Sequence, residues 1–405
     1  MVFDLIVIGG GAAGFFAAIQ LAERVPDSKI LILEQSQRVL EKVKVSGGGR
    51  CNITHACFDP RELAKYYPRG NKALLGPFHQ FMSGDMIAWL DEKGVPTKIE
   101  ADGRMFPESN KSQSIIDCFL KCIQKYKIDV LKQCRVASFE QKEDLWHLQT
   151  SQDQFTTKNL LVATGSSKRI WEHLYTLGHK IIDPIPSLFT FKIGHPLLHD
   201  LPGLSVKNGS VSIADSKLKE TGPILITHWG LSGPGILKLS AWGARLLHER
   251  NYNFSIFVNW TELDFNQMEA EIKSLKNDFG GKKIASKNLF DIPKRLWLRM
   301  LELLKIEKIN WADLSNKKIT LFATMLTNCE LQVTGKSTFK EEFVTCGGID
   351  LNEVNFKKME SKLFPNLYFA GEVLDIDAVT GGFNFQAAWT TAWLVAQAVV
   401  VMVKK

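Results

Sequence analysis

FDLIVIGGGAAG, residues 3–14, decides the fold of this chain. Residues 5–8 are a short continuous apolar run, typical of a strand buried on both faces of a parallel sheet. Gly9, Gly11 and Gly14 then give the spacing G-x-G-x-x-G. In that pattern the first glycine allows a tight turn, the second lets a phosphate approach the backbone, and the third lets a helix pack close to the strand. The stretch therefore predicts a dinucleotide-binding loop.

A helix and a second strand follow this loop. Residues 15–22 are an apolar helical segment, and its positive dipole end points at a pyrophosphate beside Ala12 and Ala13. The strand 29–33 ends at Glu34, 34 − 14 = 20 residues beyond the last glycine. A carboxylate there bonds the ribose 2′-OH and repels a 2′-phosphate, so we expect FAD or NAD and not NADP. The alternative is a packing turn without a ligand.

Length and charge limit the possible classes of protein. At 405 residues the chain is long enough for two or three units, and 45% of its residues are hydrophobic. Its formal net charge is +7. This basic balance fits an anionic partner such as nucleic acid, although many soluble enzymes are equally basic.

Cysteine usage and apolar runs indicate the compartment. The seven cysteines are an odd number without a C-x-x-C pair, which favours a reducing compartment and gives no cysteine zinc site. No metal site is expected. The apolar run 387–403 is short for a membrane span and contains Thr390, Thr391 and Gln397, so we expect a core helix. No signal peptide is visible, and the predicted location is the cytoplasm.

Three further segments carry glycines where a ligand would lie. Gly47, Gly48 and Gly49 leave backbone N–H groups for a ligand, and Arg50 can meet a phosphate or carboxylate; a flexible loop is the alternative. The buried strand 159–163 runs into Thr164 and Gly165. The last core strand, 367–370, ends at Gly371 and Glu372.

From about residue 191 the chain changes character. Short strand-like pieces separated by Gly, Pro and Asn predict a β-rich unit. It contains THWGLSGPG at 227–235, where His228 is either a proton donor or a structural hydrogen-bonding group. Residues 262–315 are helical and include Lys282, Lys283, Lys287 and Lys294, which form either a solvated face or an RNA contact.

Together these motifs resemble the YhiN-like flavoproteins, bacterial FAD enzymes with two dinucleotide-binding folds. The matching pieces are IGGGAAG at 8–14, SGGGRCN at 46–52, GRMFP at 103–107, ATG at 163–165, THWGLSGPG at 227–235, CGGID at 346–350 and YFAGEVLDIDAVTGGFNFQ at 368–386. They span nearly the whole chain. One departure is Ser166, where the family usually has a second glycine after ATG, and it puts the shape of that loop in doubt.

The resemblance implies an α/β fold with a discontinuous Rossmann-like FAD domain, residues 1–190 and 342–405. An inserted substrate-side domain, 191–341, would have a β-barrel-like part (191–260) and a helical part (261–341).

The resemblance also implies roles for single residues. The backbone of Val136 would meet the adenine, and Glu372 would bond the ribityl chain or a nearby water. The N–H groups of Gly382, Phe383, Asn384 and Phe385, at the start of a helix, would face the flavin N1 and C2=O, where negative charge develops on reduction.

The implied activity is FAD-dependent oxidoreduction, with hydride passing through the flavin N5. No covalent flavin anchor and no second G-x-G-x-x-G motif are visible, so FAD would be non-covalent and NAD(P)H would dock transiently. The leading substrate is uridine in large-subunit ribosomal RNA, reduced to dihydrouridine. The alternatives are a small-molecule oxidase or dehydrogenase (aminoacetone or a steroid enone) and a non-catalytic flavin-bearing module. His228 and Cys51 are the candidate proton donors.

Overall fold

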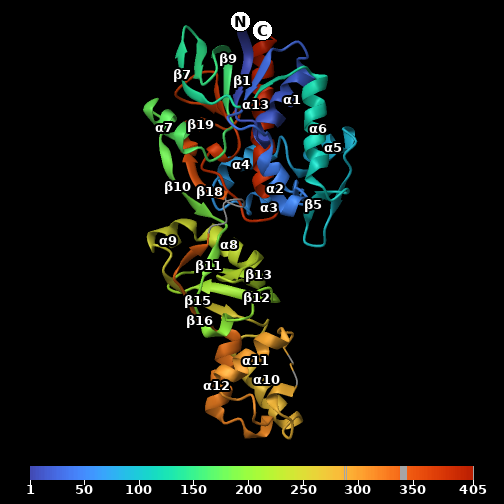
Figure 1. Ribbon diagram of the computed structural model, residues 1–405, viewed down its shortest axis with the longest axis vertical. Helices are drawn as coiled ribbons and strands as arrows, with labels where there is room; N and C mark the ends of the chain where they lie inside the picture. The colour runs from blue at the N-terminus through green and yellow to red at the C-terminus, as the bar shows by residue number, and fades with distance from the viewer. Residues whose placement is uncertain (287, 289, 338–343, 405) are drawn as a thin grey trace. The chain divides into compact units, whose positions relative to one another are not determined.

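The computed structural model describes residues 1–286, 288, 290–337 and 344–404. The chain divides into two compact units, and each is described by itself below. The first comprises Met1–Ile185 and Val344–Lys405, and the second comprises Pro186–Phe343 (Figure 1). The boundary expected at 341/342 lies outside the described residues.

The first unit is built on a parallel sheet. Its parallel strands run in the order β6-β2-β1-β9-β21. They are β1 (Val2–Ile8), β2 (Ile30–Leu33), β6 (Asp129–Leu131), β9 (Gln154–Val162) and β21 (Leu367–Phe369). Leu5 pairs with Ile30 on one side and with Asn159 on the other. The apolar run 5–8 is therefore the middle of the sheet, as its continuous hydrophobicity predicts.

Shorter strands extend this unit. Antiparallel strands flank the sheet: β7 (Val136–Lys142), β8 (Leu145–Thr150), β19 (Val354–Asn355) and β20 (Glu360–Ser361). A three-stranded sheet contains β3 (Thr54–His55), β4 (Thr97–Ile99) and β5 (Arg104–Pro107), and a two-stranded one contains β10 (Ile181–Ser187) and β18 (Val344–Ile349).

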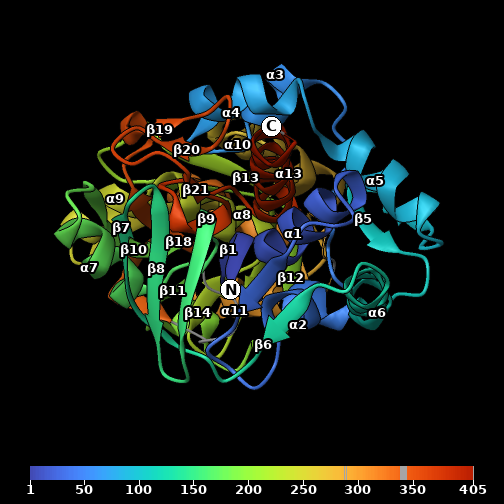
Figure 2. The same cartoon turned by 90° about the horizontal axis from the view of Figure 1, so that it is seen from above.

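The first unit also contains eight α-helices among its described residues. They are α1 (Ala12–Arg24), α2 (Glu41–Gly49), α3 (Pro60–Ala64), α4 (Asn71–Phe78), α5 (Ser83–Glu92), α6 (Ser112–Lys125), α7 (Lys168–Thr176) and α13 (Phe383–Val403). The two helices α1 and α13 pack side by side (Figure 2). Phe16 of α1 makes an edge contact with Trp389 of α13, at 5.5 Å between ring centroids. By length and composition α13 could cross a membrane, but 61% of its most apolar window is buried within the protein.

The second unit contains a seven-stranded antiparallel sheet in the order β16-β15-β12-β13-β14-β11-β17. The strands are β11 (Thr190–Lys192), β12 (Ser205–Ile213), β13 (Lys219–Ile226), β14 (Gly230–Ser232), β15 (Phe254–Asn259), β16 (Cys329–Val333) and β17 (Gly335–Ser337). Its helices are α8 (Pro234–Trp242), α9 (Ala244–Glu249), α10 (Phe265–Asp278), α11 (Lys294–Leu303) and α12 (Asn316–Thr327), with the short 3-10 helices η1 (Pro196–Leu198), η2 (Ile284–Ser286) and η3 (Trp311–Asp313).

The predicted helical part 261–341 is wrong at its C-terminal end. After α12 the chain returns to the sheet as β16 and β17, which pair with β15 and β11. In β16 the side chains of Cys329, Leu331 and Val333 are buried while the two between them are exposed. This period of two is the strand pattern, and the preceding lysine-rich helical sequence obscured it. Residues 338–341 of the predicted part lie outside the described residues.

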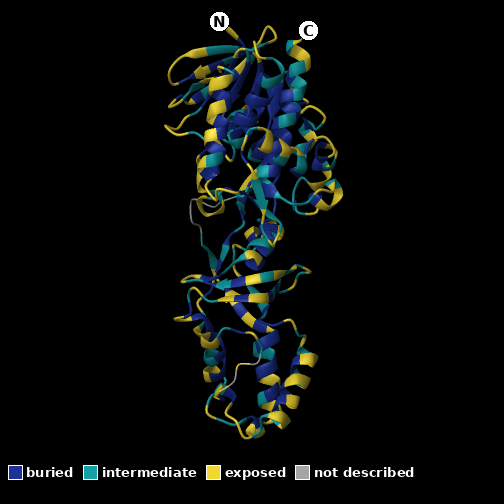
Figure 3. Cartoon of the chain, turned by 90° about the vertical axis from the view of Figure 1, so that its right-hand side faces the viewer, coloured by how far each residue is buried: buried dark blue, intermediate teal, exposed yellow. Residues whose placement is uncertain are grey.

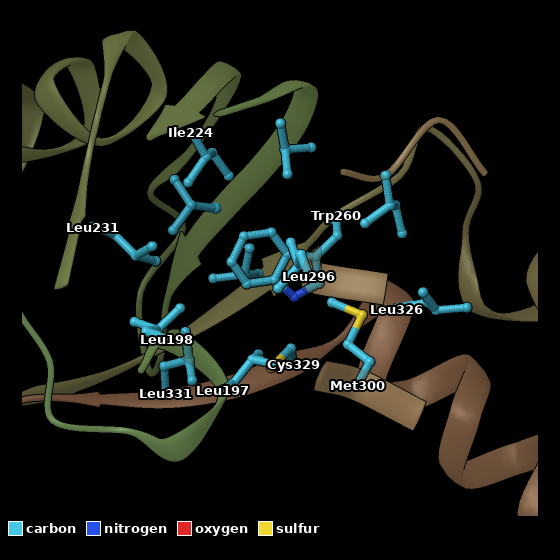
Figure 4. Packing of buried hydrophobic residues seen from close by; sticks show 14 of the residues in the cluster. Leu197, Leu198, Ile224, Leu231, Trp260, Leu296, Met300, Leu326, Cys329 and Leu331 are labelled. Atoms are coloured by element: carbon cyan, nitrogen blue, oxygen red, sulfur yellow. The ribbon is translucent and has the colours of Figure 1, made fainter. Parts of the chain in front are cut away.

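One hydrophobic cluster joins the sheet and the helices of the second unit. Figure 4 shows Trp260 between Leu198 and Leu331 on the sheet side and Met300 and Leu326 on the helix side. Both the sheet and the helices of this unit have buried and exposed positions (Figure 3). The helical segment therefore belongs to the same folding unit as the sheet that precedes and follows it.

Candidate functional site

The glycines of the 9–14 loop have different structural roles. Gly9 has φ +114°, and a Cβ there would lie 2.4 Å from the Ala163 carbonyl oxygen. A Cβ on Gly14 would lie 2.1 Å from the Gly9 carbonyl oxygen. A Cβ on Gly11 meets nothing within 4 Å, and no side chain caps α1 at this end. Gly9 and Gly14 thus permit the packing, while Gly11 borders open space that a phosphate can enter.

Glu34 lies directly beside this loop. One carboxylate oxygen, Oε2, accepts a hydrogen bond from the Gly10 N–H (2.8 Å), and the other, Oε1, accepts one from the Ser36 N–H (2.7 Å). The Cys134 N–H donates to the Glu34 carbonyl (2.9 Å), two residues before Val136. The carboxylate predicted to meet a ribose and the segment predicted to meet an adenine are therefore neighbours.

The second glycine cluster forms a left-handed turn at the end of α2. Gly47, Gly48 and Gly49 all have positive φ, and Cβ atoms on the last two would meet nothing within 4 Å. The Arg50 guanidinium pairs with Glu100 (2.5 Å) and lies 3.9 Å from the centre of the Phe106 ring. The turn has room for a ligand, but Arg50 already has a carboxylate partner.

The segments 164–165 and 371–372 meet beside α1. The Thr164 hydroxyl is buried and has no hydrogen-bond partner among the described residues. A Cβ on Gly165 would lie 3.6 Å from a carboxylate oxygen of Glu372, and one on Gly371 would lie 3.3 Å from the Cβ of Ala13. Glu372 accepts a hydrogen bond from the Thr345 N–H (3.1 Å) and pairs with Lys42. Two predicted stretches that are far apart in the sequence thus lie beside the start of α1.

The start of α13 is held by side chains from other segments. With its amide oriented to satisfy all three groups, Asn52 accepts from the Gly382 N–H (2.9 Å) and donates to the carbonyls of Met105 (3.2 Å) and Thr54 (3.1 Å). The Gly382 N–H is therefore already bonded.

The next residues of α13 are also fixed by contacts. Phe383 stacks on Tyr66 at 4.1 Å. The Asn384 side chain bonds both backbone groups of Ala378, and Phe385 stacks on Trp389 at 5.5 Å. A turn fixed by so many contacts presents its remaining N–H groups in a defined orientation.

Sequence reasoning did not assign Asn52, Lys42 or Glu100. Asn52 stands three residues after Gly49, and its closeness to the second glycine cluster was its only signal in the sequence. Lys42 lies 330 residues from Glu372, and Arg50 lies 50 residues from Glu100. No spacing rule relates residues so far apart in the chain.

The two candidate proton donors differ in their surroundings. Cys51 is fully buried, and burial raises the pKa of its thiol to about 12, which disfavours proton release at neutral pH. His228 belongs to the second unit, where it is exposed and lines a pocket. The position of His228 is therefore the more suitable for exchanging a proton with a substrate or solvent.

The residues of the first unit fit a flavin dinucleotide. The open space at Gly11, the uncapped start of α1, the carboxylate of Glu34 and the unpaired hydroxyl of Thr164 are what a pyrophosphate and a ribose require. In the described ranges no group of three or more His, Cys, Asp or Glu side chains could hold a metal ion.

The profile of the family described as "HI0933-like protein Rossmann domain" matches residues 3–398. The chain belongs to this family. It is 28% identical to the ribosomal RNA dihydrouridine synthase of Escherichia coli K12, covering 98% of this chain and 97% of the relative. It is 25% identical to the 3-dehydro-bile acid delta(4,6)-reductase of Clostridium scindens, and the match covers 97% of this chain and 98% of the relative.

Two solved structures share the fold. The 3-ketosteroid-delta4-(5alpha)-dehydrogenase of Rhodococcus jostii RHA1 matches with a TM-score of 0.53 at 11% identity, covering 98% of this chain and 96% of that one. A flavocytochrome c3 fumarate reductase matches with a TM-score of 0.51 at 13% identity, and the match covers 100% of this chain and 79% of that one. The predicted fold class, family resemblance and enzyme class are therefore confirmed.

Proposed function

We propose that the protein reduces uridine in large-subunit ribosomal RNA to dihydrouridine, in the cytoplasm, with FAD as the hydride carrier and NAD(P)H as the electron donor. The observation that carries this proposal is the full-length similarity to the relatives named ribosomal RNA dihydrouridine synthase, at 28% and 27% identity. In this proposal residues 1–190 and 342–405 bind FAD and residues 191–341 contact the substrate.

Different residues of the chain would bind FAD, stabilise its reduced form and donate a proton. The N–H groups at the start of α1 would bind the pyrophosphate, and Glu34 would bond the adenosine ribose. Free N–H groups at the start of α13 would stabilise the negative charge that reduction creates. Bound FAD, once reduced by NAD(P)H, would supply the hydride that uridine C6 receives. A proton must then reach C5, and His228 is the proposed donor.

The bile-acid relative supports a second candidate. Its name describes reduction of a C=C bond conjugated with a ketone. The C5=C6 bond of uridine is likewise conjugated with a carbonyl, so both reactions add hydride to the β carbon and a proton to the α carbon. A steroid enone or another small conjugated substrate is therefore the alternative to RNA.

One experiment tests both candidates. The purified holoenzyme is reduced anaerobically with NADPH or NADH and then mixed either with a large-subunit ribosomal RNA transcript or with a steroid enone. Reoxidation by RNA, with dihydrouridine detected by mass spectrometry of the digested transcript, is the expected result. Reoxidation by the enone alone would contradict the RNA assignment.

Salt dependence tests the contact with RNA separately. Lys282 and Lys283 are exposed, while Lys287 lies outside the described residues. If they contact phosphates, Lys282→Glu with Lys283→Glu should weaken RNA binding and flatten the plot of log K against log salt by about 0.7 per lost contact on a single strand. The charge-matched control is Lys357→Glu with Lys358→Glu in the first unit. This control should change neither the RNA affinity nor the slope of log K against log salt. Salt-insensitive binding by the unmodified protein would contradict the proposal.

A further inference from the structure

The strand β3 and the residue before it bond to the first two turns of α13. The Thr54 hydroxyl donates a hydrogen bond to the side-chain oxygen of Gln386 (2.6 Å), and the Ile53 carbonyl accepts one from the indole N–H of Trp389 (3.0 Å). Gln386 and Trp389 are three residues apart, so they lie on the same face of the helix. All four residues are buried. This face of α13 is therefore fixed to a neighbouring strand of the first unit.

Asn52 extends the contact to the start of the helix. With its amide oriented as described above, it accepts a hydrogen bond from the Gly382 N–H (2.9 Å) and donates to the carbonyls of Met105 (3.2 Å) and Thr54 (3.1 Å). Thr54 and Met105 are paired residues of β3 and β5. The side chain that holds the start of α13 is thus itself held by two paired strands, and its orientation is fixed.

Tyr67 holds the next part of the same turn. Its hydroxyl donates a hydrogen bond to the Phe383 carbonyl (2.5 Å), and its side chain is fully buried. A hydrogen bond shielded from water is electrostatically stronger than an exposed one. Because the peptide group is planar, fixing the Phe383 carbonyl also fixes the direction of the Asn384 N–H.

The N–H groups at the start of α13 depend on this support. Gln386 is the first residue whose N–H has an acceptor within the turn, the Gly382 carbonyl (3.1 Å). Phe383, Asn384 and Phe385 come before it, and among the described residues no side chain caps this end of the helix. Such N–H groups lack intrahelical acceptors and favour a negative charge in front of them. How well they meet that charge is determined by the side chains that hold the turn.

We propose that Asn52 and Tyr67 are positioning residues of the flavin reaction. By holding the start of α13 they keep its free N–H groups aimed at the negative charge of the reduced flavin. Hydrogen bonds to a charged acceptor are stronger than those to a neutral one, so the two side chains favour reduced FAD over oxidised FAD. This role rests on the placement of the reduced flavin under Proposed function.

The test is the two-electron midpoint potential of the FAD-loaded protein, measured by anaerobic reduction beside a reference dye. Asn52→Ala removes the acceptor of the Gly382 N–H. It should weaken the binding of reduced FAD about ten-fold relative to oxidised FAD, the effect of losing one hydrogen bond to a charged group. For a two-electron couple this is a fall of about 30 mV. Tyr67→Phe keeps the ring, removes the hydroxyl and should shift the potential in the same direction.

The matched control is Asn159→Ala in the same unit. Asn159 is 2% exposed, and its side chain donates a hydrogen bond to the carbonyl of Asp4 (2.8 Å), which belongs to β1 and not to α13. Its loss should destabilise the apoprotein, as measured by thermal unfolding, because a buried hydrogen bond is removed. The midpoint potential should stay unchanged.

The outcomes separate the positioning role from the proposed function. Unchanged potentials in Asn52→Ala and Tyr67→Phe, in proteins that still form dihydrouridine, overturn the role and leave the function standing. An equal fall in Asn159→Ala also overturns it, since general loosening of the unit would then explain the effect. If Asn52→Ala does not fold or holds no FAD, Tyr67→Phe decides alone. Lowered potentials in both variants of an enzyme that forms no dihydrouridine support the role and contradict the RNA substrate.

Discussion

The loop 9–14 in the first unit and the loop 230–235 in the second have the same outline. The first contains four glycines and leads from β1 into α1, and the second contains three glycines and leads from β14 into α8. In the first loop, a Cβ on Gly11 would enter open space. In the second, Cβ atoms on Gly230, Gly233 and Gly235 would lie 2.3, 2.7 and 3.2 Å from backbone oxygens of the same unit.

The difference shows what each set of glycines does. In the second loop the close neighbour is the protein's own backbone, so its glycines are required for packing. In the first loop Gly9, Gly10 and Gly14 have close neighbours, and Gly11 leaves space at the uncapped start of a helix. Free space beside unpaired N–H groups, rather than the number of glycines, distinguishes a ligand loop from a packing loop.

The largest expected effect comes from filling the second loop. Gly230→Val places a side chain 2.3 Å from the Phe191 carbonyl oxygen at φ +146°, so we expect a loss of at least about 3 kcal/mol in the free energy of unfolding. Chemical denaturation measures the loss. Gly194→Val is the control, because a Cβ there meets nothing within 4 Å. Equal stability of the two variants would show that Gly230 is not a packing glycine.

Filling the first loop should abolish FAD binding and spare the fold. Gly11 has φ −90° and ψ −169°, which valine adopts readily, and its Cβ meets no protein atom within 4 Å. Gly11→Val should therefore bind no FAD, while the apoprotein loses less than about 1 kcal/mol of stability. Absorbance titration with FAD and thermal unfolding of the apoprotein measure the two effects. An unfolded apoprotein would mean that Gly11 is a packing glycine as well.

Glu34→Ala should weaken FAD binding less than the change at Gly11. It removes a charged hydrogen-bond acceptor at the ribose, worth about 1.5–3 kcal/mol, and frees the N–H groups of Gly10 and Ser36. The FAD dissociation constant measures the loss, and Glu34→Gln should fall between the two proteins. Equal losses from Gly11→Val and Glu34→Ala would contradict the placement of the ribose.

The smallest expected effect is at Thr164. Its buried hydroxyl has no partner among the described residues, so Thr164→Val should leave the apoprotein equally stable or slightly more stable. FAD binding should weaken by about 1 kcal/mol if the hydroxyl bonds the cofactor. Thr164→Ser keeps the hydroxyl and should bind FAD nearly as well as the unmodified protein. Unchanged affinity in Thr164→Val would remove Thr164 from the site.

Much of the first unit could be predicted because its signals are local. The run 5–8, the glycine spacing and the acid at Glu34 all lie within one strand-helix-strand unit. The structure places these elements at the centre of the parallel sheet. The segments at Gly165 and Gly371 were also recognisable, since each directly follows a strand of that sheet.

The features that could not be predicted depend on contacts between residues that are distant in the sequence. The strands β16 and β17 pair with strands that precede three helices, and no local pattern encodes that return. The Arg50–Glu100 pair and the Asn52–Gly382 hydrogen bond join separate segments in the same way. Such partners are determined by tertiary packing, so sequence spacing could not supply them.

The flavin content of the purified protein tests the central claim most directly. The protein is denatured by heat, and the released flavin is identified and quantified by chromatography. The account predicts one FAD per chain in the supernatant, because the loop at Gly11 and the carboxylate of Glu34 are suited to a dinucleotide held without a covalent bond. Release of FMN, or flavin that stays with the precipitated protein, would contradict it.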